Sequence, residues 1–117
     1  MNATRLSGVM QYAMDLEASK AWYADFLGVE PEDFQLPMFA WGDGAQLLIA
    51  PASPETGRGG TGVWFEVEDV QAAYEERKAR GYTFNEEPMD IPPGKLVTIN
   101  DPDGNIVGLI DNSKGPM

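Results

Sequence analysis

The sequence contains no cysteine and no histidine. Without cysteine, the chain forms no disulfide and offers no thiolate to a metal. Without histidine, it lacks the commonest transition-metal ligand and the commonest general base near neutral pH. Nucleophilic arrangements of the Ser-His-Asp or Cys-His kind are therefore excluded, and a metal site would have to use carboxylates, amides and carbonyls, which suit hard cations. A cysteine-free chain also fits the cytoplasm, where we expect this protein.

Basic residues are few as well. The chain has 8 lysines and arginines against 19 aspartates and glutamates, a net charge of −11 that is spread over both halves. Such a protein repels nucleic acid and anionic membranes and attracts cations, although acidity also serves solubility alone. No apolar run approaches the roughly 18 residues that span a bilayer, and the first residues do not read as a secretory signal. We therefore expect no nucleic-acid partner and no membrane partner.

What the chain does contain is an internal repeat. The stretch GVMQYAMDLEAS begins at Gly8, and the similar stretch GVWFEVEDVQAA begins at Gly62, 54 residues further on. Each reads as a short strand, an aspartate and then a helix, with Asp15 and Asp69 in the position of helix N-caps. A duplicated module is the economical explanation of this pattern.

The elements that follow each helix are short strands. Apolar residues at helical spacing predict that the first helix runs from Leu16 to a stop at Gly28, with Trp22 and Tyr23 in the core. The sequence GDG then predicts a tight hairpin in the first copy, and DPDGN predicts one in the second. Each copy therefore reads β-α-β-β-β, an α+β pattern. We expect one domain over residues 1–117, in which a module at 6–50 and a module at 61–112 are joined by a flexible linker at 51–60.

The stretch DPDGN, residues 101–105, could also be a cation-binding loop. The EF-hand loop has its glycine at the sixth position and a glutamate at the twelfth. Here Gly104 is fourth and no such glutamate follows. Pro102 presets φ, and the next three residues tolerate left-handed geometry, so a turn is the favoured interpretation.

The helix DLEASKAWYADFLGV and the final hairpin DPDGNIVGLI, placed on a duplicated β-α-β-β-β module, resemble the glyoxalase/bleomycin-resistance/extradiol-dioxygenase superfamily. This superfamily is also called vicinal oxygen chelate. The resemblance covers about Leu6 to Asn112. It implies two modules whose mixed sheets curl into a cup that encloses the ligand, and a metal site in the enzymatic members.

The resemblance also implies where that metal would be held, on the first and last strands of each module. Those positions fall on Gly8, Leu48, Gly62 and Gly108, and none of them carries a donor side chain. We therefore expect no metal and no cofactor. Glyoxalase I chemistry and extradiol ring cleavage, which need the metal, are not expected.

Strand alternation predicts which residues face the cup. If Gly62 faces it, so do Trp64 and Glu66, while Val63, Phe65 and Val67 pack on the helix. The same rule places Met10 and Tyr12 beside Gly8 and leaves Gln11 on the helix side. Phe39 and Trp41 share one face of the strand before the GDG hairpin. The predicted ligand-binding residues are Met10, Tyr12, Phe39, Trp41, Leu48, Trp64, Glu66 and Gly108.

Each of these assignments has a plainer alternative. Trp41 and Trp64 could be ordinary core residues, and Glu66 could be exposed at a strand edge. As ligand-binding residues, the tryptophans would stack on a planar guest or hold a cation over their faces, and Glu66 would orient it.

The leading hypothesis is a metal-free member of the superfamily that binds and sequesters a planar, cationic or amphipathic small molecule, such as an antibiotic. The resemblance implies a homodimer in which modules can be exchanged between chains. The alternative hypothesis is a metal-independent lyase or isomerase with Glu66 as general base and Tyr12 as its partner, since an apolar cup would raise the pKa of a carboxylate. A third is an inert partner subunit or regulator.

Overall fold

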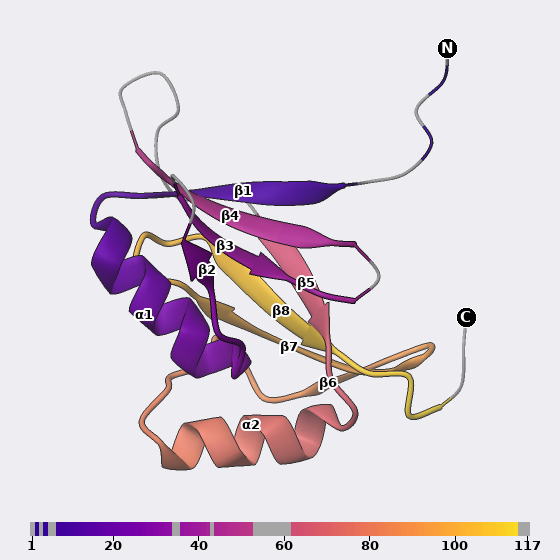
Figure 1. Ribbon diagram of the computed structural model, residues 1–117. Coiled ribbons are helices and arrows are strands. Elements are labelled where there is room, and N and C mark those ends of the chain that lie inside the picture. Colours follow the sequence, from indigo (N-terminus) through magenta and orange to yellow (C-terminus); the bar gives the residue numbers. More distant parts are fainter. Residues whose placement is uncertain are drawn as a thin grey trace. The chain divides into compact units, whose positions relative to one another are not determined.

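The computed structural model describes residues 2, 4, 7–33, 36–42, 44–52 and 62–114. The chain divides into two compact units, Met1–Gly59 with Pro102–Gly104, and Gly60–Asp101 with Asn105–Met117. Their elements are β1 (Gly8–Ala13), α1 (Leu16–Leu27), β2 (Glu32–Asp33), β3 (Pro37–Ala40) and β4 (Gln46–Pro51), followed by β5 (Gly62–Glu66), α2 (Val70–Ala79), β6 (Met89–Ile91), β7 (Gly94–Asn100) and β8 (Ile106–Ile110) (Figure 1). Each half therefore has the predicted order β-α-β-β-β.

The two sheets have the same topology. Their strand orders are β1-β4-β3-β2 and β5-β8-β7-β6. In each sheet the first strand pairs with the last in parallel, and the other neighbours are antiparallel. The repeat seen in the sequence is thus a repeat of the fold, and the predicted α+β class with mixed sheets is confirmed. The cup that the resemblance implies stays a prediction.

Each sheet buries one face against its own helix. In the first module α1 contributes the fully buried rings of Tyr23 and Phe26, and the sheet contributes Phe39, Leu47 and Ile49. In the second module Val70 and Tyr74 of α2 are buried, and the sheet contributes Val97, Ile99, Val107 and Leu109. These residues follow period-two alternation along the strands. The opposite face of each sheet is therefore not covered by the helix of its own module.

The helix ends follow the predicted caps. The Asp15 carboxylate accepts from the amide of Ala18 at 3.1 Å, and the Asp69 carboxylate accepts from Ala72 at 3.1 Å. Each bond satisfies one of the free amides of a first helical turn. Helix α1 ends at Gly28, whose φ of 71° is the left-handed geometry that favours glycine.

The stretch DPDGN is a turn, as predicted. The amide of Asp101 donates to the carbonyl of Asn105 at 2.8 Å, and the Asp101 carboxylate accepts from the Asn105 amide and side chain, both at 2.9 Å. Both side chains are buried. The Asp101 carboxylate therefore closes its own turn. The turn connects β7 to β8 and fixes the register between these two strands.

A buried carboxylate ties α2 to its sheet. Asp111 accepts from the amide of Val70 at 2.7 Å, from the amide of Lys95 at 2.9 Å and from the Ser113 hydroxyl at 2.8 Å. Burial alone would raise the pKa of Asp111, but the hydrogen bonds from Val70, Ser113 and Lys95 outweigh it and hold the pKa at about 2. The residue therefore holds the start of α2, the start of β7 and the end of β8 together.

Two predicted boundaries move. Pro51, assigned to the linker at 51–60, is the last residue of β4 and pairs with Ala13. A proline is tolerated there because it ends the strand. Residues 53–60 lie outside the described part of the chain. Val67, expected on the helix side of the same strand as Val63 and Phe65, lies one residue beyond β5, although it still donates to the carbonyl of Ile110 at 2.9 Å. Among the described residues, no helix is long and apolar enough to cross a membrane.

Candidate functional site

The face of the second sheet that α2 does not cover is the strongest candidate site. Along β5 the residues alternate, with Gly62, Trp64 and Glu66 exposed and Val63 and Phe65 half-buried. This is the alternation predicted from the sequence. Trp64 is 61% exposed, which is unusual for the most hydrophobic of the large aromatic side chains. The interpretation of Trp64 as ordinary core is therefore wrong for this module.

The indole of Trp64 lies across Gly108. The two residues are direct partners on β5 and β8. A β-carbon placed on Gly108 would lie 2.6 Å from Cε3 and 3.1 Å from Cζ3 of Trp64, and 3.6 Å from Cδ1 of Leu96. The six-membered ring of the indole thus fills the space that a side chain at position 108 would need. Glycine at 108 is what allows the ring to rest on the sheet.

Glu66 lies on the same face of β5, two residues after Trp64. Its partner across the strands is Ile110, and its side chain is exposed. A carboxylate two residues from an exposed indole can attract a cation that the ring also holds. Trp64 and Glu66 therefore share one face of β5, and Glu66 is exposed on an edge strand of the sheet, as its plainer alternative expected.

The uncovered face of the first sheet carries apolar side chains. Met10 of β1 pairs with Leu48 of β4, and Leu48 in turn pairs with Met38 of β3. Met10 is 40% exposed, and Tyr12, Met38 and Leu48 are half-buried. This face therefore carries a row of apolar side chains, of which the two methionines are the most flexible.

Gln11 lies on the helix side of β1, as the alternation predicted. A buried glutamine among apolar residues needs a hydrogen-bond partner. Its Nε2 donates to the hydroxyl of Tyr23 on α1 at 3.5 Å. The register of β1 is therefore the one predicted, with Met10 and Tyr12 on the uncovered face.

Phe39 does not belong to this face, so its prediction as a ligand-binding residue is wrong. Its side chain is fully buried, and its ring lies 6.2 Å from that of Tyr23 on α1. Alternation along β3 gives the reason, because Met38 takes the uncovered side. Trp41 lies one residue beyond β3, where its amide donates to the carbonyl of Ala45 in the hairpin at 3.1 Å, and it is half-buried.

The positions implied for a metal do not fit one. At Gly8 a β-carbon would lie 2.5 Å from the carbonyl oxygen of Gln46, and at Gly108 the indole of Trp64 occupies the space. Leu48 is apolar, and Gly62 has room but no donor atom. Among the residues that the structure describes, no group of three or more aspartates and glutamates could hold an ion. The residues present therefore do not provide the donor set of the enzymatic relatives.

A polar cluster that the sequence analysis missed lies two strands from Trp64. Leu96, Thr98 and Asn100 share the uncovered face of β7, because Val97 and Ile99 are buried on the helix side. Asn85 Nδ2 donates to Thr98 Oγ1 at 3.1 Å and to Asn100 Oδ1 at 3.1 Å. The alternation of polar and apolar residues in KLVTIN was the available signal.

Glu86 belongs to the same cluster. It accepts from the Thr98 amide at 2.7 Å and from the Thr98 hydroxyl at 3.0 Å. Because β6 pairs with β7 only as far as Leu96, this bond satisfies an amide beyond the end of that pairing. Glu86 thereby fixes the position of Thr98 on the uncovered face.

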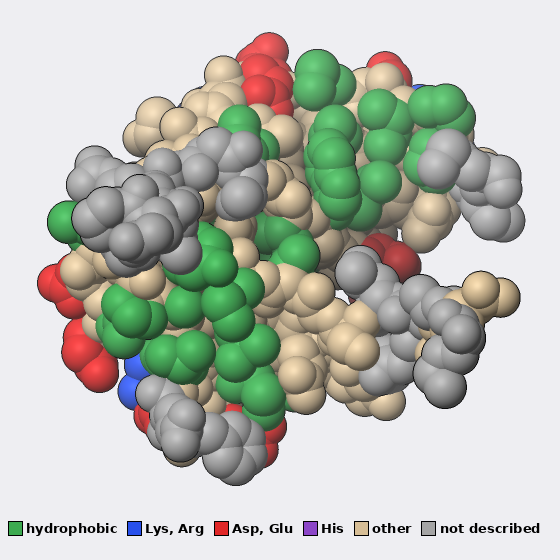
Figure 2. Space-filling model, turned by 90° about the horizontal axis from the view of Figure 1, so that it is seen from above, with side chains coloured by type: hydrophobic (Ala, Val, Ile, Leu, Met, Phe, Trp, Pro, Cys, Tyr) green, Lys and Arg blue, Asp and Glu red, His purple; other side chains and the backbone are tan. Residues whose placement is uncertain are grey.

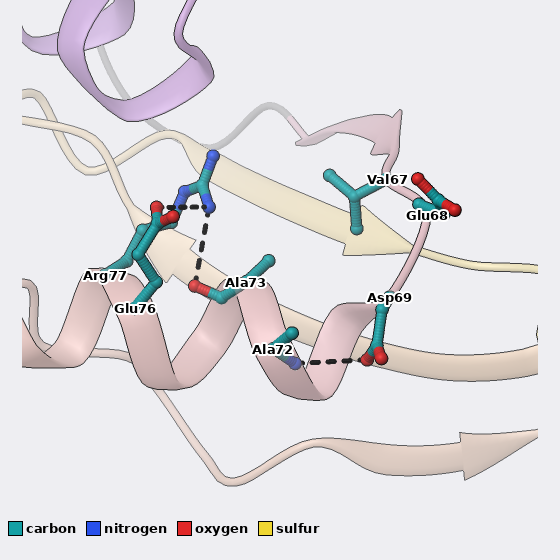
Figure 3. A pocket seen from close by; sticks show the side chains of 7 residues that line it. All are labelled: Val67, Glu68, Asp69, Ala72, Ala73, Glu76 and Arg77. Carbon is teal, nitrogen blue, oxygen red and sulfur yellow. Dashed lines mark hydrogen bonds and ion pairs between the residues drawn. The ribbon is translucent and has the colours of Figure 1, made fainter.

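A groove of about 500 Å³ beside α2 is a weaker candidate (Figure 3). Three of its four charged side chains already have partners. Asp69 caps the helix, while Arg77 pairs with Glu76 at 3.4 Å and donates to the carbonyl of Ala73 at 3.4 Å. The groove is lined by Val67, Glu68, Asp69, Ala72, Ala73, Glu76 and Arg77. None of these was predicted to bind a ligand, and nothing about them favours one.

Four of the large hydrophobic side chains that the structure shows exposed lie on uncovered strand faces: Met10, Trp64, Met89 and Ile106. Val9 lies on the helix side of β1, and Met14 follows that strand. Figure 2 shows that hydrophobic side chains gather in contiguous patches on the surface seen there. Patches of this kind on a small protein mark a surface that binds a ligand or another chain.

Comparison with known proteins agrees with the topology. The family model described as Glyoxalase/Bleomycin resistance protein/Dioxygenase superfamily matches residues 5–109. The uncharacterised protein YurT of Bacillus subtilis is 24% identical, with 85% of this chain and 92% of that protein covered. TnmS3, an antibiotic binding protein from Streptomyces sp. CB03234, has a TM-score of 0.83 at 23% identity, over 97% of this chain and 99% of that chain. Lactoylglutathione lyase from Agrobacterium tumefaciens has a TM-score of 0.76 at 25% identity, over 95% and 96% of the two chains.

Proposed function

The chain belongs to the Glyoxalase/Bleomycin resistance protein/Dioxygenase superfamily, and we propose that it is a member that binds and sequesters a small molecule without a metal. The ligand that we propose is planar and either cationic or amphipathic. Antibiotics include such molecules, and the structurally similar TnmS3 is described as an antibiotic binding protein. We keep the cytoplasm as the proposed location, on the sequence argument alone.

The exposed indole of Trp64 is the observation that carries this proposal. A ring that is 61% exposed on a sheet face, resting on a glycine, presents a broad apolar surface. Stacking on such a surface favours planar guests, and the nearby Glu66 favours positive charge. Met10, Tyr12, Trp41 and Leu48, in the first module, are kept as further proposed ligand-binding residues.

The proposal that binding is metal-free follows from the positions that would hold the ion. Gly8 and Gly108 lack both a donor and the space for one, and Leu48 offers only carbon atoms. The affinity must therefore come from stacking, apolar burial and charge. Each of these is available on the uncovered strand faces.

We further propose that the binding unit is a homodimer. The exposed Val9, Met14 and Met89 leave apolar surface in contact with water. A two-fold partner would cover part of it, and exchange of modules between chains is one way to do so.

An enzyme that uses Glu66 as a general base is less well supported. General-base catalysis by a carboxylate at neutral pH calls for a desolvated group. Glu66 is exposed on β5. Glu66 is better suited to attract charge than to remove a proton.

Titration of tryptophan fluorescence with a planar cationic dye such as acridine orange tests the proposal. The ligand is expected to quench the emission of Trp64, and Trp64→Ala is expected to cost on the order of 1–3 kcal/mol of binding free energy. Trp22→Phe is the matched control, because Trp22 stacks on Phe26 within α1 at 4.9 Å. If both variants bind as well as the wild type, the ligand does not use this face of the second sheet.

A further inference from the structure

The polar cluster on β7 forms a hydrogen-bonding edge beside the indole. Trp64, Gly108 and Thr98 are successive partners across β5, β8 and β7. Adjacent strands are about 4.8 Å apart, and Gly108 contributes no side chain between them. The indole itself covers Gly108, so a ring stacked on its outer face can extend past it toward the side chains of Thr98 and Asn100.

The hydrogen bonds within the cluster determine what it can offer a ligand. An amide nitrogen carries two hydrogens, and Asn85 Nδ2 uses both, on Thr98 and on Asn100. Within the described part of the chain, this leaves Asn85 Oδ1 as an acceptor and Asn100 Nδ2 as a donor. Both residues are exposed. The cluster thus presents one acceptor beside one donor.

Glu86 restricts the charge that a ligand can carry at this edge. Its two oxygens both accept from Thr98, so it fixes the cluster instead of offering a free carboxylate. Its negative charge nevertheless lies beside the edge and disfavours an anionic group there. A ligand group that matches this edge is therefore neutral and carries one hydrogen-bond donor beside one acceptor.

We propose that Asn85 and Asn100 select planar ligands whose ring edge carries an N–H or O–H donor beside a carbonyl, as in a cyclic amide or imide. This inference rests on the proposed function, since Trp64 must first hold the ring. The ligand donates to Asn85 Oδ1 and accepts from Asn100 Nδ2. Charge and hydrogen-bonding pattern are then recognised by different strands, because Glu66 lies on β5 and Asn100 on β7.

Alloxazine and phenazine provide a matched pair of probes. Both have three linearly fused six-membered rings, but only alloxazine carries N–H and carbonyl groups on a terminal ring. In equilibrium dialysis, alloxazine is expected to bind the wild-type protein about ten-fold more tightly than phenazine, because two hydrogen bonds distinguish the probes.

Asn85→Ala and Asn100→Ala are each expected to abolish most of that preference and to leave phenazine binding unchanged. Asn112→Ala, at an exposed asparagine after β8, is the control that retains the preference.

The outcomes separate the two proposals. Equal binding of the two probes by the wild type, or variants at Asn85 and Asn100 that keep the full preference, would overturn the selective edge. The stacking site would survive that result if Trp64→Ala still weakened both probes. Failure of both probes to bind would count against the stacking site itself, and the edge would fall with it.

Discussion

The indole of Trp64 occupies the volume above Gly108, with Cε3 2.6 Å from the point where a β-carbon on residue 108 would lie. In the enzymatic relatives that the sequence resembles, this position would supply a metal ligand. Here the same place on the sheet supports an aromatic ring.

Gly108→Ala is expected to displace the indole, because the new methyl group would collide with ring carbons. We expect about a ten-fold loss of affinity for a planar ligand and a changed tryptophan emission, measured by fluorescence titration. Gly62→Ala is the matched control, since a β-carbon there meets nothing closer than Ile106 Cβ at 3.8 Å. Equal loss of affinity in both variants would show that the contact between Trp64 and Gly108 is not what matters.

Glu66→Gln is expected to weaken cationic ligands more than neutral ligands of the same shape, because the substitution removes charge and keeps size. Added salt should weaken the cationic ligands as well, since a chain with a net charge of −11 attracts cations partly through its long-range field. Calorimetric titrations at low and high ionic strength measure both effects. A neutral ligand that loses as much affinity as a cationic one would exclude a charge-selecting role for Glu66.

Asp111 is expected to make the protein sensitive to acid. Its pKa is about 2 in the folded chain and 3.8 in its ordinary state, so its stabilising contribution is complete above about pH 4 and disappears as the pH falls toward 2. The difference corresponds to about 2 kcal/mol in the free energy of unfolding. Urea unfolding between pH 2 and pH 6 measures this contribution.

Asp111→Asn should remove most of that pH dependence and lower the stability at pH 6. Asp90→Asn is the control, because Asp90 is exposed and its ion pairs with Lys95 and Lys114 are screened by solvent. An unchanged acid transition in Asp111→Asn would assign the sensitivity to other carboxylates.

The purified protein is expected to carry no stoichiometric transition metal. The reason is the lack of donors at Gly8, Leu48, Gly62 and Gly108, together with the absence of histidine and cysteine from the whole chain. Elemental analysis after dialysis measures the content directly. One zinc, nickel, iron or manganese per chain would show that the ligand positions were assigned wrongly.

The protein is expected to be a dimer, with a mass near twice 12.8 kDa by light scattering. Burial of exposed apolar side chains outside the proposed ligand site, such as Val9 and Met14, supplies the driving force. A clean monomer at tens of micromolar would contradict the dimer without affecting the fold. Substituting Met14, which is 66% exposed, by lysine gives a variant whose mass reports whether that side chain lies in the interface.

The sequence by itself determined the modules, their helices and their turns. These depend on local interactions, as with the capping carboxylates of Asp15 and Asp69 and the closed turn from Asp101 to Asn105. It also determined which side of β5 bears Trp64 and Glu66, because alternation along a strand is a property of the backbone.

Only the tertiary structure decided which candidates share a surface. Strand alternation places Phe39 and Trp41 on the same side of the chain. In the structure, however, Phe39 is buried against α1, and β3 ends before Trp41. The cluster of Asn85, Thr98 and Asn100 depends on pairing between segments distant in sequence, which no local pattern specifies. The fit of Trp64 over Gly108 likewise required the register of β5 and β8, because a shift of one residue would have placed the indole over a side chain.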